Sequence, residues 1–220
     1  DARNFFYEFA WKHIHKFDSS YDILEGKNKL GNDRIESNEV DIDIFVNHAV
    51  HLIGSNSFNR KNTLLAIYGA YALARGEDLS LKKILIHQLH QAPYVFSFAD
   101  DFPKVKIIAC MRDPRVFGSQ LETWKKHMSF SRSSIGVYYS VLKQLIDGVN
   151  PLLNLSNISI RVNVLERIHQ SPEKILKNIC NWLKIDFNQL LLKSTWNGKE
   201  WLGDSLSNDI NETFNPKRYI

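Results

Sequence analysis

The feature that most constrains the fold is a short apolar run that leads directly into charged residues and a proline. Residues 105–111 have the length and composition of a buried β-strand, and Arg112, Asp113 and Pro114 follow them. Proline is tolerated in the first turn of a helix, so the pattern predicts a strand followed directly by a helix. In open α/β sheets, ligands bind where strands end and helices begin, so Arg112 is predicted to lie at an anion site.

Other apolar segments alternate between strand and helix periodicities. Short apolar runs at 84–86 and 158–165 predict two further strands, and parallel pairing of 84–86 with 105–111 would bring His87 or His90 beside Arg112. Helical spacing predicts helices over residues 3–16, 41–53, 59–74, 94–101, 133–153 and 171–184. The alternation is typical of an α/β fold with a mostly parallel sheet, and the length suits a single domain over residues 1–220.

Composition excludes several classes of protein. The net charge of +4 is mild, which argues against binding duplex nucleic acid and suits a small anionic ligand better. Cys110 and Cys180 are too few for a disulfide framework or a metal cluster, and are expected to be small buried hydrophobes. Because no apolar run approaches the roughly 20 residues of a spanning helix, no membrane span is expected.

Three segments carry the chemistry. The first reads Phe102-Pro-Lys-Val-Lys-Ile-Ile-Ala-Cys-Met-Arg-Asp-Pro-Arg, with Ser119 after it; the second reads Val164-Leu-Glu-Arg-Ile-His-Gln-Ser-Pro-Glu-Lys-Ile-Leu; the third reads Thr195-Trp-Asn-Gly-Lys-Glu-Trp-Leu-Gly-Asp-Ser. In this order they resemble segments of the sulfotransferases that use 3′-phosphoadenosine 5′-phosphosulfate. The resemblance covers about residues 82–205. It implies a P-loop NTPase-like fold with three layers, in which helices flank a mostly parallel sheet.

The resemblance also implies which residues bind the donor. Arg112 and Ser119 would hold its 3′-phosphate, and Gly198 with Lys199 would close over the same group. A guanidinium suits a phosphate fork, and a glycine beside a lysine combines close approach with charge. Ser119 follows Arg112 by seven positions, one fewer than the family pattern, which leaves Arg115 or Gln120 as substitutes.

The implied reaction transfers a sulfuryl group to a hydroxyl or amine of a small-molecule or glycan acceptor and releases adenosine 3′,5′-bisphosphate. In this family a polar residue after the preceding strand, often histidine, acts as general base on the acceptor. His87 is the first candidate and His90 the second, although a structural role for His87 is equally open. No metal is required, because cationic side chains would stabilise the leaving phosphate.

The family's glycine-rich loop for the 5′-phosphosulfate has no counterpart in the sequence, and no GxxxxGK[ST] motif occurs. We expect the first strand and this loop upstream of Asp1, unless the chain has lost them. A non-catalytic nucleotide-binding or scaffold module of the same fold is the alternative function, and a P-loop kinase-like enzyme is a third. The expected location is cytoplasmic, or the Golgi lumen if an anchor precedes Asp1.

Overall fold

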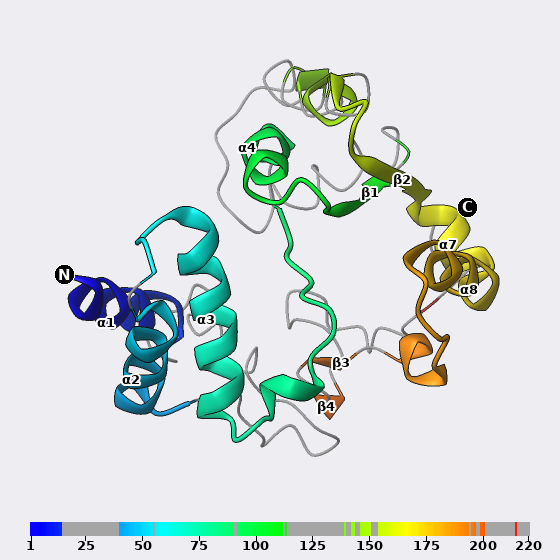
Figure 1. Ribbon diagram of the computed structural model, residues 1–220. Helices are drawn as coiled ribbons and strands as arrows, with labels where there is room; N and C mark the ends of the chain where they lie inside the picture. The colour runs from blue at the N-terminus through cyan, green and yellow to red at the C-terminus, as the bar shows by residue number, and fades with distance from the viewer. Residues whose placement is uncertain are drawn as a thin grey trace. The chain divides into compact units, whose positions relative to one another are not determined.

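The computed structural model describes residues 1–14, 40–54, 56–89, 92–111, 113, 139, 142–143, 146–150, 154–193, 195–196, 199–200 and 214. They contain helices and a parallel pair of strands, which confirms the predicted α/β class (Figure 1). The chain divides into two compact units, residues 1–87 with 193–213 and residues 88–192 with 214–220. A single domain over residues 1–220 stays a prediction.

The first unit is built on three helices. They are α1 (Ala2–His13), α2 (Ile42–Ile53) and α3 (Arg60–Ala74). Each begins after a residue whose side chain accepts a hydrogen bond from a backbone N–H of the first turn, and these N-caps are Asp1, Asp41 and Asn59. The helix α2 ends at Gly54, whose φ of +47° favours glycine. The predicted bounds of these helices are therefore confirmed to within a few residues.

The core of this unit lies where α2 packs against α1 and α3. Large residues from α1 and α2, such as Phe6 and Phe45, are fully buried against small ones from α3, such as Ala66 and Ala70. Gly69 permits a close approach of the helices, because a Cβ there would lie 2.8 Å from Leu52 Cδ1. The apolar face that the sequence predicts for α2 is thus the face that forms the core.

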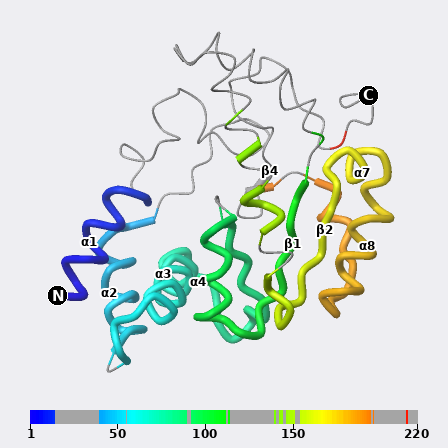
Figure 2. Tube along the Cα trace, turned by 90° about the horizontal axis from the view of Figure 1, so that it is seen from above, coloured from blue at the N-terminus to red at the C-terminus, as the bar shows by residue number. Residues whose placement is uncertain are grey.

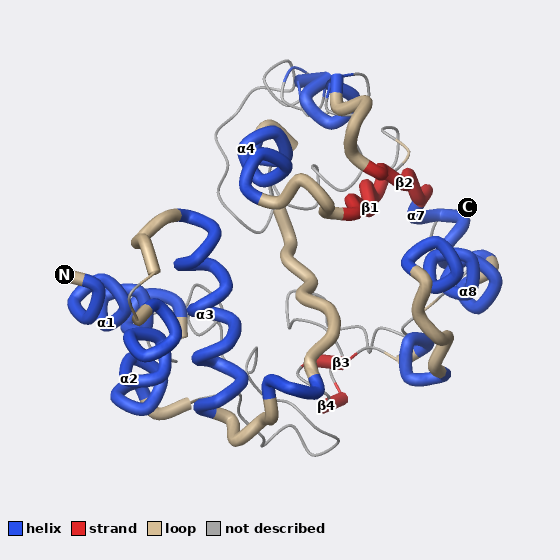
Figure 3. Tube along the Cα trace, viewed as in Figure 1, coloured by secondary structure: helices blue, strands red, loops and turns tan. Residues whose placement is uncertain are grey.

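The strand predicted at residues 84–86 is not present. After the short 3-10 helix η1 (Leu79–Leu81), residues 82–89 form neither helix nor strand, and Figure 3 draws this segment as loop. Ile84 is 51 % exposed and Ile86 is 82 % exposed. The prediction was wrong because an apolar run becomes a strand only when a neighbouring strand accepts its backbone hydrogen bonds.

The second unit contains the parallel sheet. Strand β1 (Lys106–Met111) pairs with β2 (Ser159–Val164) in register, from Lys106 opposite Ser159 to Met111 opposite Val164. The strands lie side by side in Figure 2. The strands predicted from the apolar runs at 105–111 and 158–165 are confirmed, and so is their parallel direction. The helix expected after Pro114 lies outside the described residues.

Helices precede and follow this pair of strands. They are α4 (Tyr94–Asp101), α7 (Leu165–Gln170) and α8 (Pro172–Leu183), with a 3-10 helix η2 (Gln189–Leu192) after them. The helix α7 follows β2 without a loop and contacts both β2 and α8. Helix α8 buries Cys180, as predicted, and ends at Lys184 in a left-handed conformation. The same prediction was wrong for Cys110 of β1, which is exposed. Within the predicted helix 133–153, the described positions 139, 142–143 and 146–150 are helical.

Candidate functional site

The carboxyl ends of β1 and β2 lie at the same edge of the sheet, because the strands run parallel and end opposite each other at Met111 and Val164. Just beyond this edge, the backbone N–H of Asp113 donates to Glu166 Oε1 at 2.9 Å. Glu166 belongs to the first turn of α7, where a negative charge is favoured by the helix dipole. The carboxylate therefore ties the residue after Arg112 to the helix that follows β2, which agrees with the prediction from the sequence that Glu166 is a structural partner of a backbone or basic group rather than a catalytic acid.

Two buried polar atoms lie on the β2 side of this edge. Asn163, which is 5 % exposed, leaves its side-chain Nδ2 without an acceptor, and Glu166 Oε2 has no donor, within the part of the chain that the structure describes. Asn163 is paired in register with Cys110 of β1. A buried polar group costs free energy until it finds a partner. Both atoms are thus buried polar groups next to the end of β2 that have no partner among the described residues.

The cations of the two strands bind helix α8 instead of this edge. Lys106 Nζ donates to the carbonyl oxygen of Trp182 at 2.6 Å, and Arg161 Nη1 donates to that of Asn178 at 3.1 Å. Lys106 Nζ also lies 5.3 Å from the centre of the Trp182 ring. These carbonyls belong to the last turns of α8, where positive charge is favoured. Lys106 and Arg161 therefore hold the helix on the sheet.

His87, the first candidate base, pairs with a tyrosine of α3. Tyr68 Oη lies 2.9 Å from His87 Nδ1, and the rings meet edge to face with 5.9 Å between their centres and 88° between their planes. Burial raises the pKa of Tyr68 and lowers the pKa of His87, because partial desolvation disfavours the charged form of each. Both side chains are consequently neutral near pH 7. The sequence offered no signal for this pair, since the residues are 19 positions apart.

The third segment contains a short hairpin where a loop was predicted. Strand β3 (Thr195–Trp196) pairs antiparallel with β4 (Lys199–Glu200), with Trp196 opposite Lys199. The intervening dipeptide is Asn-Gly, which is strongly preferred in two-residue hairpin turns. That dipeptide was the signal that could have predicted the hairpin. The backbone of Lys199 lies in β4, and its side chain is outside the described part.

The remaining predicted site residues are not described. They are His90, Arg112, Arg115, Ser119 and Gly198. Leu89 before His90, Met111 and Asp113 on either side of Arg112, and Lys199 after Gly198 are placed, so the chain is defined next to three of them. The predicted binding and catalytic roles of all seven candidates stay predictions.

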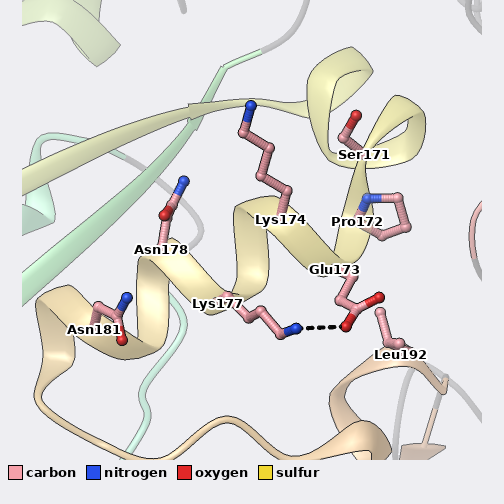
Figure 4. Close-up of a pocket in the computed structure, with 8 residues that line it drawn as sticks. All are labelled: Ser171, Pro172, Glu173, Lys174, Lys177, Asn178, Asn181 and Leu192. Atoms are coloured by element: carbon pink, nitrogen blue, oxygen red, sulfur yellow. Dashed lines mark ion pairs between the residues drawn. The ribbon is translucent and has the colours of Figure 1, made fainter.

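A shallow hollow of about 760 Å³ lies along the polar face of α8, and Leu192 of η2 borders it (Figure 4). Its two lysines are Lys174 and Lys177, and Lys177 Nζ pairs with Glu173 Oε1 at 2.7 Å. Lys177 Nζ also lies 5.3 Å from the centre of the Phe187 ring. Since Lys177 is neutralised within its own helix and no predicted site residue lines the hollow, we assign it no role in the site.

Within the described ranges, no group of three or more histidine, cysteine, aspartate or glutamate side chains could hold a metal ion together. None of the helices in the placed part of the chain combines the length and the apolar character needed to cross a bilayer. Comparison of the chain with family models, with curated proteins and with solved structures found no match.

Proposed function

We propose that this protein is a sulfotransferase, which transfers a sulfuryl group from 3′-phosphoadenosine 5′-phosphosulfate to a hydroxyl or amine of a small-molecule or glycan acceptor. The observation that carries the proposal is the hydrogen bond from the Asp113 N–H to Glu166 at the end of the parallel strands. It joins two of the three segments that resemble the family, which are far apart in sequence, at the edge where an α/β sheet binds ligands. In the proposed fold this edge belongs to a three-layer, P-loop NTPase-like structure.

The proposed donor site has Arg112 as its main cation. Arg112 stands between Met111, the last residue of β1, and Asp113, whose N–H is bound by Glu166. Because the backbone is held on both sides of Arg112, fewer conformations are lost when its guanidinium binds a phosphate. Ser119, with Arg115 as its substitute, adds a donor to the 3′-phosphate, and Gly198 and Lys199 close over that group.

The transfer needs positioning and charge stabilisation more than covalent help from the protein. The acceptor oxygen or nitrogen forms a bond to sulfur while the bond from sulfur to the 5′-phosphate oxygen breaks, and the electron pair leaves with adenosine 3′,5′-bisphosphate. A histidine takes the proton of the acceptor, with His87 as the first candidate and His90 as the second.

Binding of adenosine 3′,5′-bisphosphate by isothermal titration calorimetry tests the donor site. Arg112→Ala should weaken binding by about 10- to 100-fold, because a charge-assisted hydrogen bond contributes roughly 1.5–3 kcal/mol. Lys104→Ala is the matched control, since it removes an exposed positive charge just before the opposite end of β1. If the two variants bind alike, or if the folded wild-type chain does not bind, the donor site is refuted.

Transfer of radiolabelled sulfate from the donor to a panel of phenols, sugars and amines tests the reaction itself. A labelled product that disappears in Arg112→Ala but persists in Lys104→Ala would support the enzyme. Binding of the bisphosphate without transfer to any acceptor would instead select the non-catalytic nucleotide-binding module.

A further inference from the structure

Helix α7 is too short to maintain its position alone. It has six residues and follows β2 without a loop, and an isolated helix of that length is not stable in water. None of its six residues, all of which the structure describes, is buried. The position of α7 therefore depends on its contacts with β2, with α8 and with other parts of the chain.

One further contact of α7 comes from residue 214, which is far from the helix in sequence. The rings of His169 and Phe214 meet edge to face, with 5.8 Å between their centres and 66° between their planes. Aromatic pairs prefer this geometry, and it stabilises them beyond the effect of the area that they bury. Residues 214–220 belong to the same compact unit as α7, so this contact lies within one unit.

The ring contact and the hydrogen bond to Asp113 use the same face of α7. Glu166 and His169 are three positions apart, a spacing that places two side chains on one face of a helix. Glu166 Oε1 accepts the backbone N–H of Asp113 at 2.9 Å. Because a single short helix moves as one piece, a shift of α7 that follows loss of the Phe214 contact also moves Glu166 relative to Asp113.

We infer that Phe214 is a positioning residue for the candidate ligand site. Its ring fixes α7 through His169, and α7 in turn holds Glu166 on the N–H of Asp113, the residue after Arg112. A segment that the sequence analysis left without a role thereby supports the edge where β1 and β2 end. The effect on donor binding rests on the proposed function, whereas the coupling between Phe214 and Asp113 does not.

Amide hydrogen exchange measured by NMR on the full chain tests the coupling. Phe214→Ala should speed exchange of the Asp113 amide about 2- to 10-fold, the effect of losing one aromatic pair when exchange follows local opening. Phe214→Tyr keeps the ring and should exchange like the wild type. Phe187→Ala is the matched control, because it removes a partly buried ring of the same unit that packs against Lys177 of α8. It should leave the Asp113 amide unchanged.

A purely structural role for Phe214 would give a different result. If its ring stabilised the unit only as a whole, the amides within the paired strands β1 and β2 would accelerate together with that of Asp113. Faster exchange confined to α7 and Asp113 supports the positioning role, and equal acceleration throughout the sheet overturns it. If Phe214→Ala does not fold, Phe214→Leu, which keeps an apolar side chain without the ring, provides the same comparison.

A double-mutant cycle tests whether the effect passes through Glu166. In Glu166→Ala the hydrogen bond to Asp113 is already lost, so adding Phe214→Ala should not accelerate exchange of the Asp113 amide further. If the two effects multiply instead, Phe214 acts independently of Glu166 and the inference is refuted.

Calorimetric titration with adenosine 3′,5′-bisphosphate tests the effect on donor binding. Phe214→Ala should weaken binding by about 2- to 10-fold, in step with the faster exchange of Asp113, and Phe187→Ala should not weaken it. Unchanged affinity in Phe214→Ala, despite faster exchange, would overturn the effect on binding. If the wild-type chain does not bind the bisphosphate, the proposed function fails, while the exchange measurements still decide whether Phe214 positions α7.

Discussion

Replacing Glu166 by alanine should release the chain next to Arg112. The carboxylate accepts the backbone N–H of Asp113 at 2.9 Å in a partly buried position, and 53 residues separate the two in sequence. Hydrogen bonds to charged groups contribute roughly 1.5–3 kcal/mol. Since each 1.4 kcal/mol is about a factor of ten, the Asp113 amide should exchange with solvent roughly 10- to 150-fold faster in Glu166→Ala when exchange follows local opening.

Amide hydrogen exchange resolved by NMR is the assay, because it reports on this amide separately from global unfolding. Glu166→Gln keeps an amide oxygen that can accept the same hydrogen bond without the charge, so its exchange rate should lie between those of the wild type and of alanine. The affinity for adenosine 3′,5′-bisphosphate should be highest in the wild type, lower in Glu166→Gln and lowest in Glu166→Ala, because the released segment must be ordered again on binding.

Glu173→Ala is the matched control in the same unit. Its side chain is 49 % exposed and pairs with Lys177 one turn along α8, a contact that contributes about 0.3–0.5 kcal/mol. It should leave exchange of the Asp113 amide unchanged. Unaltered exchange of Asp113 in Glu166→Ala would show that the carboxylate does not restrain this segment, and would remove the observation on which the proposed function depends.

Three further predictions concern stability, measured by urea unfolding. Phe45→Ala should lower the free energy of unfolding by about 3–5 kcal/mol, because Phe45 is fully buried. Leu65→Ala, at a position that is 42 % exposed, should lower it by less than about 1 kcal/mol. Similar losses in the two variants would mean that α2 does not form the core. Lys184→Gly should raise the free energy of unfolding by about 1 kcal/mol, because Lys184 has a φ of 62°, which is unfavourable for a residue with a Cβ but not for glycine. A destabilised variant would contradict this reasoning. In the folded chain, burial and, to a smaller extent, the positive charge of Lys12 lower the pKa of His13. Below about pH 6.5 the unfolded chain therefore binds more protons than the folded chain, and the free energy of unfolding should decline as the pH falls through that range. His13→Gln should reduce this decline, and an identical pH dependence would refute the assignment.

The sequence by itself determined those helices and strands whose signals all lie within one segment of the chain. Helix α2 was predictable because its apolar spacing, its N-cap Asp41 and its terminal Gly54 all lie within one segment. The same holds for α8, which begins at Pro172, a residue type tolerated in the first turn of a helix, although Ser171 makes no side-chain hydrogen bond as its N-cap. Strand β1 was predictable because a strand of a parallel sheet is an almost continuous apolar run.

Tertiary structure alone decided which apolar run became a strand and which polar residues met. Residues 84–86 have the same character as β1 but no sheet partner among the described residues, and no strand forms without one. The pairing of Tyr68 with His87, and of Glu166 with Asp113, depends on contacts 19 and 53 positions apart. Periodicity shows which face of an element is apolar, but a polar contact between elements depends on their packing, which one-dimensional spacing does not contain.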